Sequence, residues 1–252
     1  MLLKKNSMLR LTLVRLRRNH LAMIGLAIVL TLIFVAVFAD YIAPFKYSRQ
    51  HLRETLQAPN AKYLLGTDEF GRDVLSRLIY GARVSLVIQF WAVMISLVIG
   101  TFLGSVSGYF GGRIDEVVMR LMDIMMAFPG ILLALAIVAI LGPSLTNLIV
   151  AIGINSVPGF SRVARGAVIS VKKNDYVTAA RAIGESDLSI LFRYVLPNAI
   201  SPIIVQTTMR MATVLLTAAG LGFLGLGVQP PSPEWGTMLS AARVYLRSAP
   251  HV

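Results

Sequence analysis

The acidic residues that could support catalysis or metal binding gather in one short stretch of the sequence. Asp68, Glu69 and Asp73 lie in the run Gly-Thr-Asp-Glu-Phe-Gly-Arg-Asp. Their spacing lacks the regular alternation of acids found in a calcium-binding loop. Arg72 and Arg77 flank the acids and can neutralise them. We therefore expect a structural ion-pair network at the outward-facing edge of the membrane, rather than a catalytic or metal site.

Other residue types that do chemistry are sparse. The absence of cysteine excludes disulfides, thiol catalysis and Cys-ligated metals. His20, His51 and His251 are scattered, with no second ligand at metal-binding spacing, so we predict no metal site. A membrane-embedded enzyme would need a pair such as histidine with a carboxylate, and no histidine lies within an apolar span; this class stays a remote alternative.

One glycine pattern formally matches a nucleotide-binding fingerprint. Gly220-Leu-Gly-Phe-Leu-Gly225 has the spacing Gly-x-Gly-x-x-Gly, but it lies inside an apolar run with no preceding strand, so we reject it. The phosphate-binding pattern Gly-x-x-x-x-Gly-Lys-Ser/Thr does not occur in the sequence. Any nucleotide must therefore be bound by another chain.

The composition indicates that the elements which hold these residues in place are membrane spans. Of the 252 residues, 56% are hydrophobic and only 14% are charged, whereas soluble domains carry about 25% charged residues. The formal net charge of +12 comes from basic residues that sit beside apolar runs, as the positive-inside rule expects. This distribution favours a membrane protein over a nucleic-acid-binding one.

The apolar runs predict an all-α, polytopic transmembrane helical bundle with five spans. The expected spans are residues 21–39, 84–108, the end of a long helix that begins at 114 and ends near 141, 145–160, and 199–226. We expect Pro158-Gly159 to end the fourth span and Pro197 to open the fifth.

The charge pattern divides the chain into three regions. Residues 1–20 carry Lys and Arg but no acid, which predicts a cytoplasmic, amphipathic segment around Leu9 and Leu13. Residues 21–83 form the first span and an outer polar stretch, and residues 84–252 form the core membrane region. The basic loop 161–197 within this core should face the cytoplasm.

Two groups of residues within the spans have a predicted role. Gly100, Gly104 and Gly108 form overlapping small-xxx-small pairs, which let helix backbones approach closely. Asn155 and Arg210 are polar groups inside spans, where such groups usually face protein or water. Either could line a solute path; helix-to-helix hydrogen bonding is the alternative for Asn155, and snorkelling to the interface is the alternative for Arg210.

The cytoplasmic loop holds a short alanine-rich helix that Gly184 should end. Ser186 can cap a second short helix after it. Such a helix can fit a groove in a partner protein, or it can pack on the lipid headgroups, and the spacing alone leaves both options open.

The same loop resembles the EAA motif of ABC importer permeases. The matching residues are Thr178, Ala179, Ala180, Gly184, Leu196 and Pro197. Thr178 stands where the motif has glutamate. The resemblance implies that this loop is the coupling helix, which docks on an ATPase subunit.

A second resemblance covers most of the chain. Several segments are similar to the second permease subunit of dipeptide, oligopeptide and nickel importers. They are Leu65 to Ser85, Gly108 to Gly112, Arg120 to Asp123, Phe128 to Gly130, and Phe223 to Gly227 followed by Trp235-Gly236.

This resemblance implies a type I ABC importer permease fold and a transport subunit rather than an enzyme. It implies import of di- or oligopeptides or a related small solute across a bacterial or archaeal inner membrane, with nickel import as an alternative. The implied partners are a second homologous permease, two ATPase subunits that bind ATP and Mg²⁺, and an extracytoplasmic solute-binding protein. The family has six spans, so we expect the sixth to be missing from these 252 residues. A passive channel would not need the coupling loop.

Overall fold

The computed structural model describes residues 16–252, which are helical apart from loops and one isolated bridge between Thr67 and Asp73. The predicted amphipathic segment around Leu9 and Leu13 lies outside the described residues. The helices, in chain order, are α2 (His20–Val37), α3 (Ala39–Ile42), α4 (Val74–Phe110), α5 (Gly112–Ala127), α6 (Gly130–Leu141), α7 (Leu145–Val171), α8 (Asp175–Ala182), α9 (Asp187–Ile190), η1 (Leu191–Val195), η2 (Pro197–Ala199), α10 (Ile200–Phe223), α11 (Trp235–Ala242) and η3 (Arg243–Tyr245).

Local sequence explains where the long helices begin. The side chains of Asn19, Asp73 and Ser144 precede α2, α4 and α7, and each accepts a hydrogen bond from a backbone N–H in the first turn. These are the residue types that best satisfy the free amides of a helix N-terminus. At the end of α4, Gly111 and Gly112 both have positive φ and turn the chain into α5.

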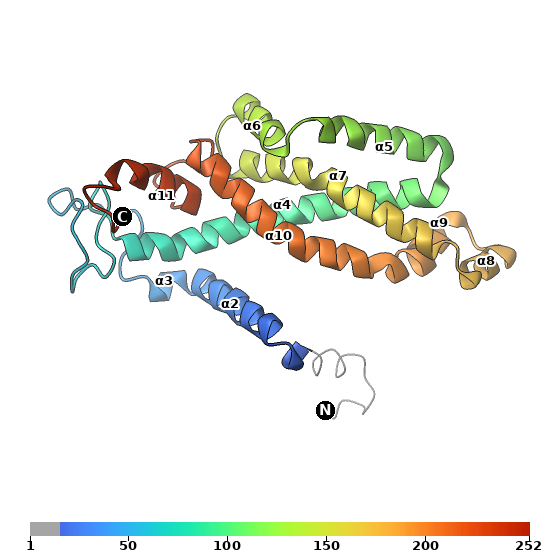
Figure 1. Ribbon diagram of the computed structural model, residues 1–252, viewed down its shortest axis with the longest axis horizontal. Helices are drawn as coiled ribbons and strands as arrows, with labels where there is room; N and C mark the ends of the chain where they lie inside the picture. Colours follow the sequence, from blue (N-terminus) through green and yellow to red (C-terminus); the bar gives the residue numbers. More distant parts are fainter. Residues whose placement is uncertain (1–15) are drawn as a thin grey trace.

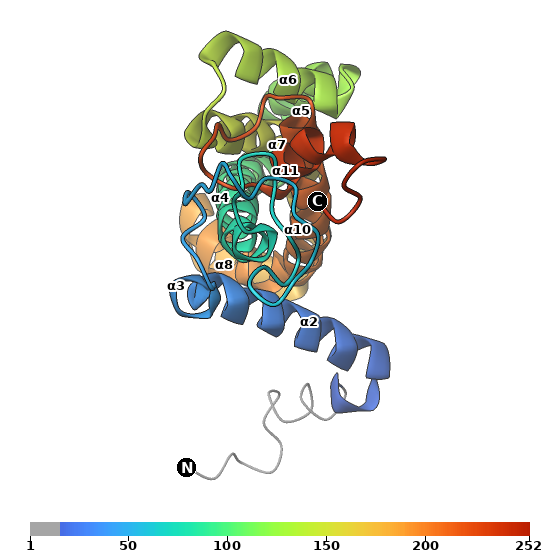
Figure 2. The same cartoon turned by 90° about the vertical axis from the view of Figure 1, so that its left-hand side faces the viewer.

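Helices α4, α7 and α10 run side by side along the long axis of the molecule (Figure 1). The outer loop 43–73 and α11 lie at one end, and α8 and α9 lie at the other (Figure 1). Viewed along the bundle, α2 lies on one side and α5 and α6 lie on the opposite side (Figure 2). Helix α2 is almost entirely uncovered by the rest of the chain, as expected for a helix that faces lipid.

The three predicted packing glycines face α7. A Cβ on Gly100 would lie 2.6 Å from the Cβ of Phe160, and one on Gly108 would lie 2.8 Å from the carbonyl oxygen of Arg165. A Cβ on Gly104 would overlap the backbone of Ser161. The small residues therefore set how closely α4 and α7 can approach.

Two hydrophobic clusters stabilise the bundle. One lies among α4, α6, α7 and α10 and includes Ile88, Leu148 and Leu221. The other joins the end of α4 to the loop helices and includes Tyr109, Val177 and Leu191. The second cluster gives the loop helices α8 and α9 a fixed position on the long helices.

The structure corrects two predicted span boundaries. The third span is not one long helix, because α5 and α6 are bent by 88° at Phe128 and Pro129. Phe128 has an extended backbone, as residues before proline prefer, and Pro129 is the N-cap residue of α6. The fourth span does not end at Pro158, because α7 continues to Val171. Pro158 is buried within α7, where packing offsets the lost backbone hydrogen bond.

The number of spans stays a prediction. Three helical segments of the described chain are long and apolar enough to cross a membrane, or four if the bent pair α5 and α6 is one span. Helix α7 is 27 residues long but is not among them. It carries Arg162 and Arg165 together with polar residues, and these lower its mean hydropathy.

Candidate functional site

The residues of the predicted coupling motif, in and after the loop helix α8, differ in their exposure to solvent. Thr178, Ala179 and Gly184 are exposed, whereas Ala180 packs inward in the second cluster. Pro197 begins η2, just before α10, and Leu196 is half-buried beside it. The exposed part of the motif is thus a small-residue helix face, with the apolar side chain of Ile183 78% exposed next to it.

The turn between α8 and α9 depends on Gly184. Its φ of +85° lies in the left-handed region, which side chains other than glycine rarely adopt. Ser186 then caps α9 by accepting a hydrogen bond from the amide of Ser189. The two helices are therefore held in a defined hairpin, the coupling hairpin.

Tyr109, at the end of α4, fixes this hairpin to the long helices. Its side chain is 2% exposed, and its hydroxyl donates a hydrogen bond of 2.6 Å to Asp187 in α9. The Arg181 guanidinium donates to the same hydroxyl at 3.3 Å, and the Lys172 ammonium donates to the Tyr109 carbonyl. The sequence did not predict this role, because Tyr109 lies in the glycine-rich segment Gly108 to Gly112 and has no neighbour in sequence that indicates a contact with α9.

A second polar contact joins α5 to α7 near the same end. The guanidinium of Arg165 donates two hydrogen bonds to the Asp115 carboxylate, from Nε to Oδ1 and from Nη2 to Oδ2, each at 2.5 Å. Ser107 also donates to this carboxylate. Such bidentate pairs fix the relative rotation of the two helices.

Asn155 and Arg210, which the sequence singled out separately, lie on one cavity. This cavity has a volume of about 300 Å³ and lies between the α5–α6 break, α7 and α10. Its lining also includes Pro129, Pro158 and Gly159. The helix break and the proline-glycine pair leave room that regular helices would fill.

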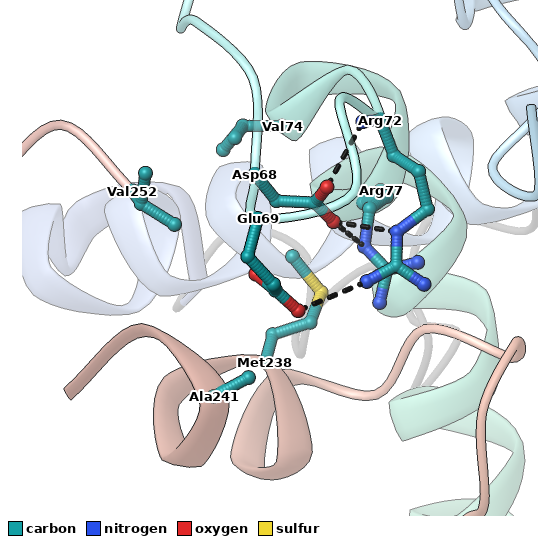
Figure 3. Close-up of a pocket in the computed structure, with 8 residues that line it drawn as sticks. All are labelled: Asp68, Glu69, Arg72, Val74, Arg77, Met238, Ala241 and Val252. Carbon is teal, nitrogen blue, oxygen red and sulfur yellow. Dashed lines mark hydrogen bonds and ion pairs between the residues drawn. The ribbon is translucent and has the colours of Figure 1, made fainter. Parts of the chain in front are cut away.

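The end of the bundle opposite α8 and α9 holds the predicted ion-pair network (Figure 3). Arg72 Nε lies 2.6 Å from Asp68 Oδ2 and its Nη2 lies 3.2 Å from Glu69 Oε1; Arg77 Nε lies 3.4 Å from Asp68 Oδ2. Asp73 is not part of this network, because it caps α4 instead. The four paired residues form a structural link at the start of α4.

Gly222 of the rejected pattern, and Gly227 beyond it, have a packing role at this end. A Cβ on Gly222 would lie 3.1 Å from the amide of Thr237, and one on Gly227 would lie 2.9 Å from the Cγ2 of Thr237. The space holds the side chain of Glu234, which is 1% exposed and accepts hydrogen bonds from the amides of Gly236 and Thr237 at 2.8 and 2.9 Å. Burial raises the pKa of Glu234 above its usual value.

Glu234 is a second residue that the sequence did not single out. The signal that could have found it is an acidic residue directly before Trp235, where α11 begins and where a carboxylate can act as an N-cap. Trp235 itself donates from its indole Nε1 to the Leu78 carbonyl at 3.2 Å, which ties α11 to α4.

The described residues form a helical bundle with spans apolar enough for a membrane, a small-residue helix at one end and a cavity between its helices, and comparison with known families identifies this arrangement as a membrane transport subunit. A family model described as "Binding-protein-dependent transport system inner membrane component" matches residues 100–247, and one described as "N-terminal TM domain of oligopeptide transport permease C" matches residues 7–59. The chain belongs to the family of binding-protein-dependent transport system inner membrane components.

Similar curated proteins agree with this family. The dipeptide transport system permease protein DppC of Alkalihalophilus pseudofirmus is 49% identical over 94% of this chain and 78% of its own length. The di/tripeptide permease DppC of Pseudomonas aeruginosa is 50% identical over 92% and 78%. The glutathione transport system permease protein GsiD of Escherichia coli is 46% identical over 94% and 79%.

Two solved structures share the fold. The inward-facing MetNI methionine ABC transporter has a TM-score of 0.59 at 20% identity, over 69% of this chain and 84% of that one. An amino acid ABC transporter with histidines has a TM-score of 0.51 at 19% identity, over 69% and 79%. The fold is therefore that of ABC importer permeases, as the sequence predicted.

Proposed function

We propose that this chain is the membrane-spanning permease subunit of an ATP-driven importer for di- or oligopeptides or a related small solute. Family membership and relatives named for dipeptide, di/tripeptide and glutathione transport support this function. The observation that carries the mechanism is the coupling hairpin, whose exposed small-residue face is fixed through Tyr109 to α4. A nickel importer is the alternative for the solute.

Family membership supports ATPase and binding-protein partners, and the proposal extends to the composition of the complex. Two permeases and two ATPase subunits form the complex, and an extracytoplasmic solute-binding protein supplies the solute. The chain itself needs no cofactor, because ATP and Mg²⁺ are bound by the ATPase subunits. The protein is a multi-pass component of the inner membrane, with its N-terminus in the cytoplasm.

The mechanism needs the coupling hairpin to transmit force. Closure of the ATPase dimer displaces the face formed by Thr178 and Ala179, and Gly184 keeps that face in its docking orientation. The contacts of Tyr109 then pass the displacement to α4, so the long helices rock between inward and outward access. Leu196 and Pro197 connect the same movement to α10.

The test is to purify the tagged chain with its partners and to measure ATP hydrolysis and solute uptake in proteoliposomes. We expect a second permease and ATPase subunits to co-purify. Ala179→Trp should weaken ATPase binding, because it adds a bulky group to an exposed docking face without disturbing the core. Gly184→Leu should leave the subunits bound but uncouple hydrolysis from uptake, because leucine disfavours the φ of +85°.

Gly166→Ala is the matched control. Gly166 is exposed on α7, and a methyl group there would have no neighbouring atom within 4 Å, so the variant should retain assembly and uptake. Normal uptake and normal stimulation of ATP hydrolysis in both hairpin variants would contradict the coupling role. Recovery of the chain alone has two readings, loss of assembly for want of the expected sixth span or a wrong importer function, and only its recovery alone after C-terminal extension with that span would contradict the importer function.

A further inference from the structure

The cavity beside the α5–α6 break contains one uncompensated positive charge. Among the described residues that line it, Arg210 is the sole charged one. No ion pair or side-chain hydrogen bond joins the Arg210 guanidinium to another residue of the described part of the chain. An ionised group in the membrane region is costly unless it is paired or faces water, so such a group marks a functional site.

The acid closest in sequence to this cavity lining is already neutralised. Asp123, one turn before the lining residue Met126, accepts a hydrogen bond of 2.5 Å from the guanidinium of Arg162. Arg162 is one turn beyond Pro158 on α7, so the ion pair flanks the cavity. Pairing of these two residues leaves the charge of Arg210 without a counterion in the cavity.

The backbone makes room for the polar groups. A Cβ on Gly159 would lie 3.1 Å from the guanidinium carbon of Arg210, and one on Gly130 would lie 3.0 Å from the amide nitrogen of Asn155. At both glycines, a polar side chain therefore packs directly against the helix backbone. Gly130 is also the first residue of α6, whose N-terminus adds a partial positive charge at the helix break.

These groups offer donors and a positive charge, and the rest of the cavity wall is largely apolar. The Arg210 guanidinium presents a planar pair of N–H donors, which matches the two oxygens of a carboxylate. The Asn155 amide can donate a further hydrogen bond. A metal cation finds no acidic ligand here, because the described lining contains no Asp or Glu.

We propose that Arg210, assisted by Asn155, binds the free carboxylate of the solute during its passage through the permease. This inference rests on the proposed function and narrows it, since it favours carboxylate-bearing solutes such as short peptides over a nickel cation. Arg210 forms a transient site in the path. The alternative counterion of Arg210 is a buried acid on the partner permease. The experiment distinguishes this acid from the carboxylate of the solute.

The experiment uses the assembled complex in proteoliposomes, with the binding protein saturated in turn by alanylalanine and by its C-terminal amide. The measured quantity is the ratio of the two maximal import rates. We expect Arg210→Gln to lower this ratio by between about tenfold and a hundredfold, the size of a charge-assisted contact. The preference of the binding protein cancels, because the same binding protein serves wild type and variant.

Three further variants make the result specific. Arg120→Gln, which removes an exposed arginine on α5 with a side chain 73% exposed, should leave the ratio unchanged. Arg210→Lys should keep part of the preference, because it retains the charge but loses the planar donor pair. Gly159→Ala should lower the ratio without removing the charge, because its methyl group displaces the guanidinium.

Two outcomes would overturn the proposal. If Arg210→Gln lowers the import rates of alanylalanine and its amide equally, the role of Arg210 is structural. Arg210→Gln that reduces recovery of the second permease would show that the counterion is an acid of that partner. Failure of the wild-type complex to import alanylalanine or to retain ATPase subunits would instead contradict the proposed function, so the two failures are distinguishable.

Discussion

The hydroxyl of Tyr109 lies 2.6 Å from a carboxylate oxygen of Asp187 and donates a hydrogen bond to it. These residues are far apart in the sequence, one at the end of α4 and the other at the start of α9. Their contact makes the coupling hairpin part of the long-helix framework. In the proposed mechanism, this contact passes a displacement of the hairpin to α4.

Tyr109→Phe should weaken coupling while keeping assembly. The ring stays buried, but the hydrogen bonds with Asp187 and Arg181 are lost, which costs about 1 kcal/mol for partly exposed partners. We expect a several-fold lower uptake per ATP hydrolysed, measured in proteoliposomes, with unchanged recovery of ATPase subunits. Asp187→Ala, which removes the acceptor, should give a similar defect, and the double variant should be no worse. Additive defects would show that the two residues act independently.

Gly104→Ala should destabilise the packing of α4 on α7. The added methyl group overlaps the backbone of Ser161, so one helix must move outward, at a cost of about 1 to 3 kcal/mol. We expect a lower thermal unfolding temperature in detergent. Gly166→Ala on α7 meets open space and should be neutral or slightly stabilising, because alanine favours helix. Equal unfolding temperatures for both variants would contradict the packing role of Gly104.

Local signals predicted much of the fold. The α8 helix, the break at Gly184 and the cap at Ser186 all match the structure, because each depends on a few adjacent residues. The proline boundaries were less predictable. Pro129 interrupts a helix where Pro158 does not, and the difference arises from the packing of α7 on α4, which has no local signal.

The candidate sites show the same division. The sequence singled out Asn155 and Arg210 by their polarity inside apolar runs, but not that they share a cavity. Tyr109 and Glu234 were missed because their roles depend on partners that only the folded chain brings close. Contacts between distant segments are set by how helices pack, which the spacing of residues within one helix does not determine.

The ion pair of Asp115 and Arg165 should contribute a measurable coupling energy. The two side chains are 21% and 35% exposed, so the bidentate contact is partly screened by solvent. In a double-mutant cycle with Asp115→Asn and Arg165→Gln, we expect a coupling of about 1 kcal/mol in the free energy of unfolding. The pair Glu116 and Arg120, at 3.8 Å and with both side chains largely exposed, is the matched control and should show almost none. A coupling near zero for both pairs would contradict a role in fixing α5 on α7.

Glu234 and Glu54 should give the outer end of the molecule opposite responses to pH. Burial raises the pKa of Glu234, whereas hydrogen bonds from Lys62 and Tyr63 lower the pKa of Glu54. For Glu234, the stabilising contribution is complete below the unfolded pKa near 4.5 and is lost as the pH rises through the higher folded value. For Glu54, the contribution is present above the unfolded value and is lost as the pH falls through the lower folded value.

The measurement is the unfolding temperature of the detergent-solubilised protein as a function of pH. Glu234→Gln should remove a loss of stability as the pH rises above 4.5 through the raised folded pKa, because the variant has no carboxylate to ionise in the buried site. Glu54→Gln should instead remove a loss of stability on acidification below pH 4.5. Identical pH profiles for wild type and Glu234→Gln would mean that this carboxylate keeps its ordinary acidity despite its burial between α10 and α11.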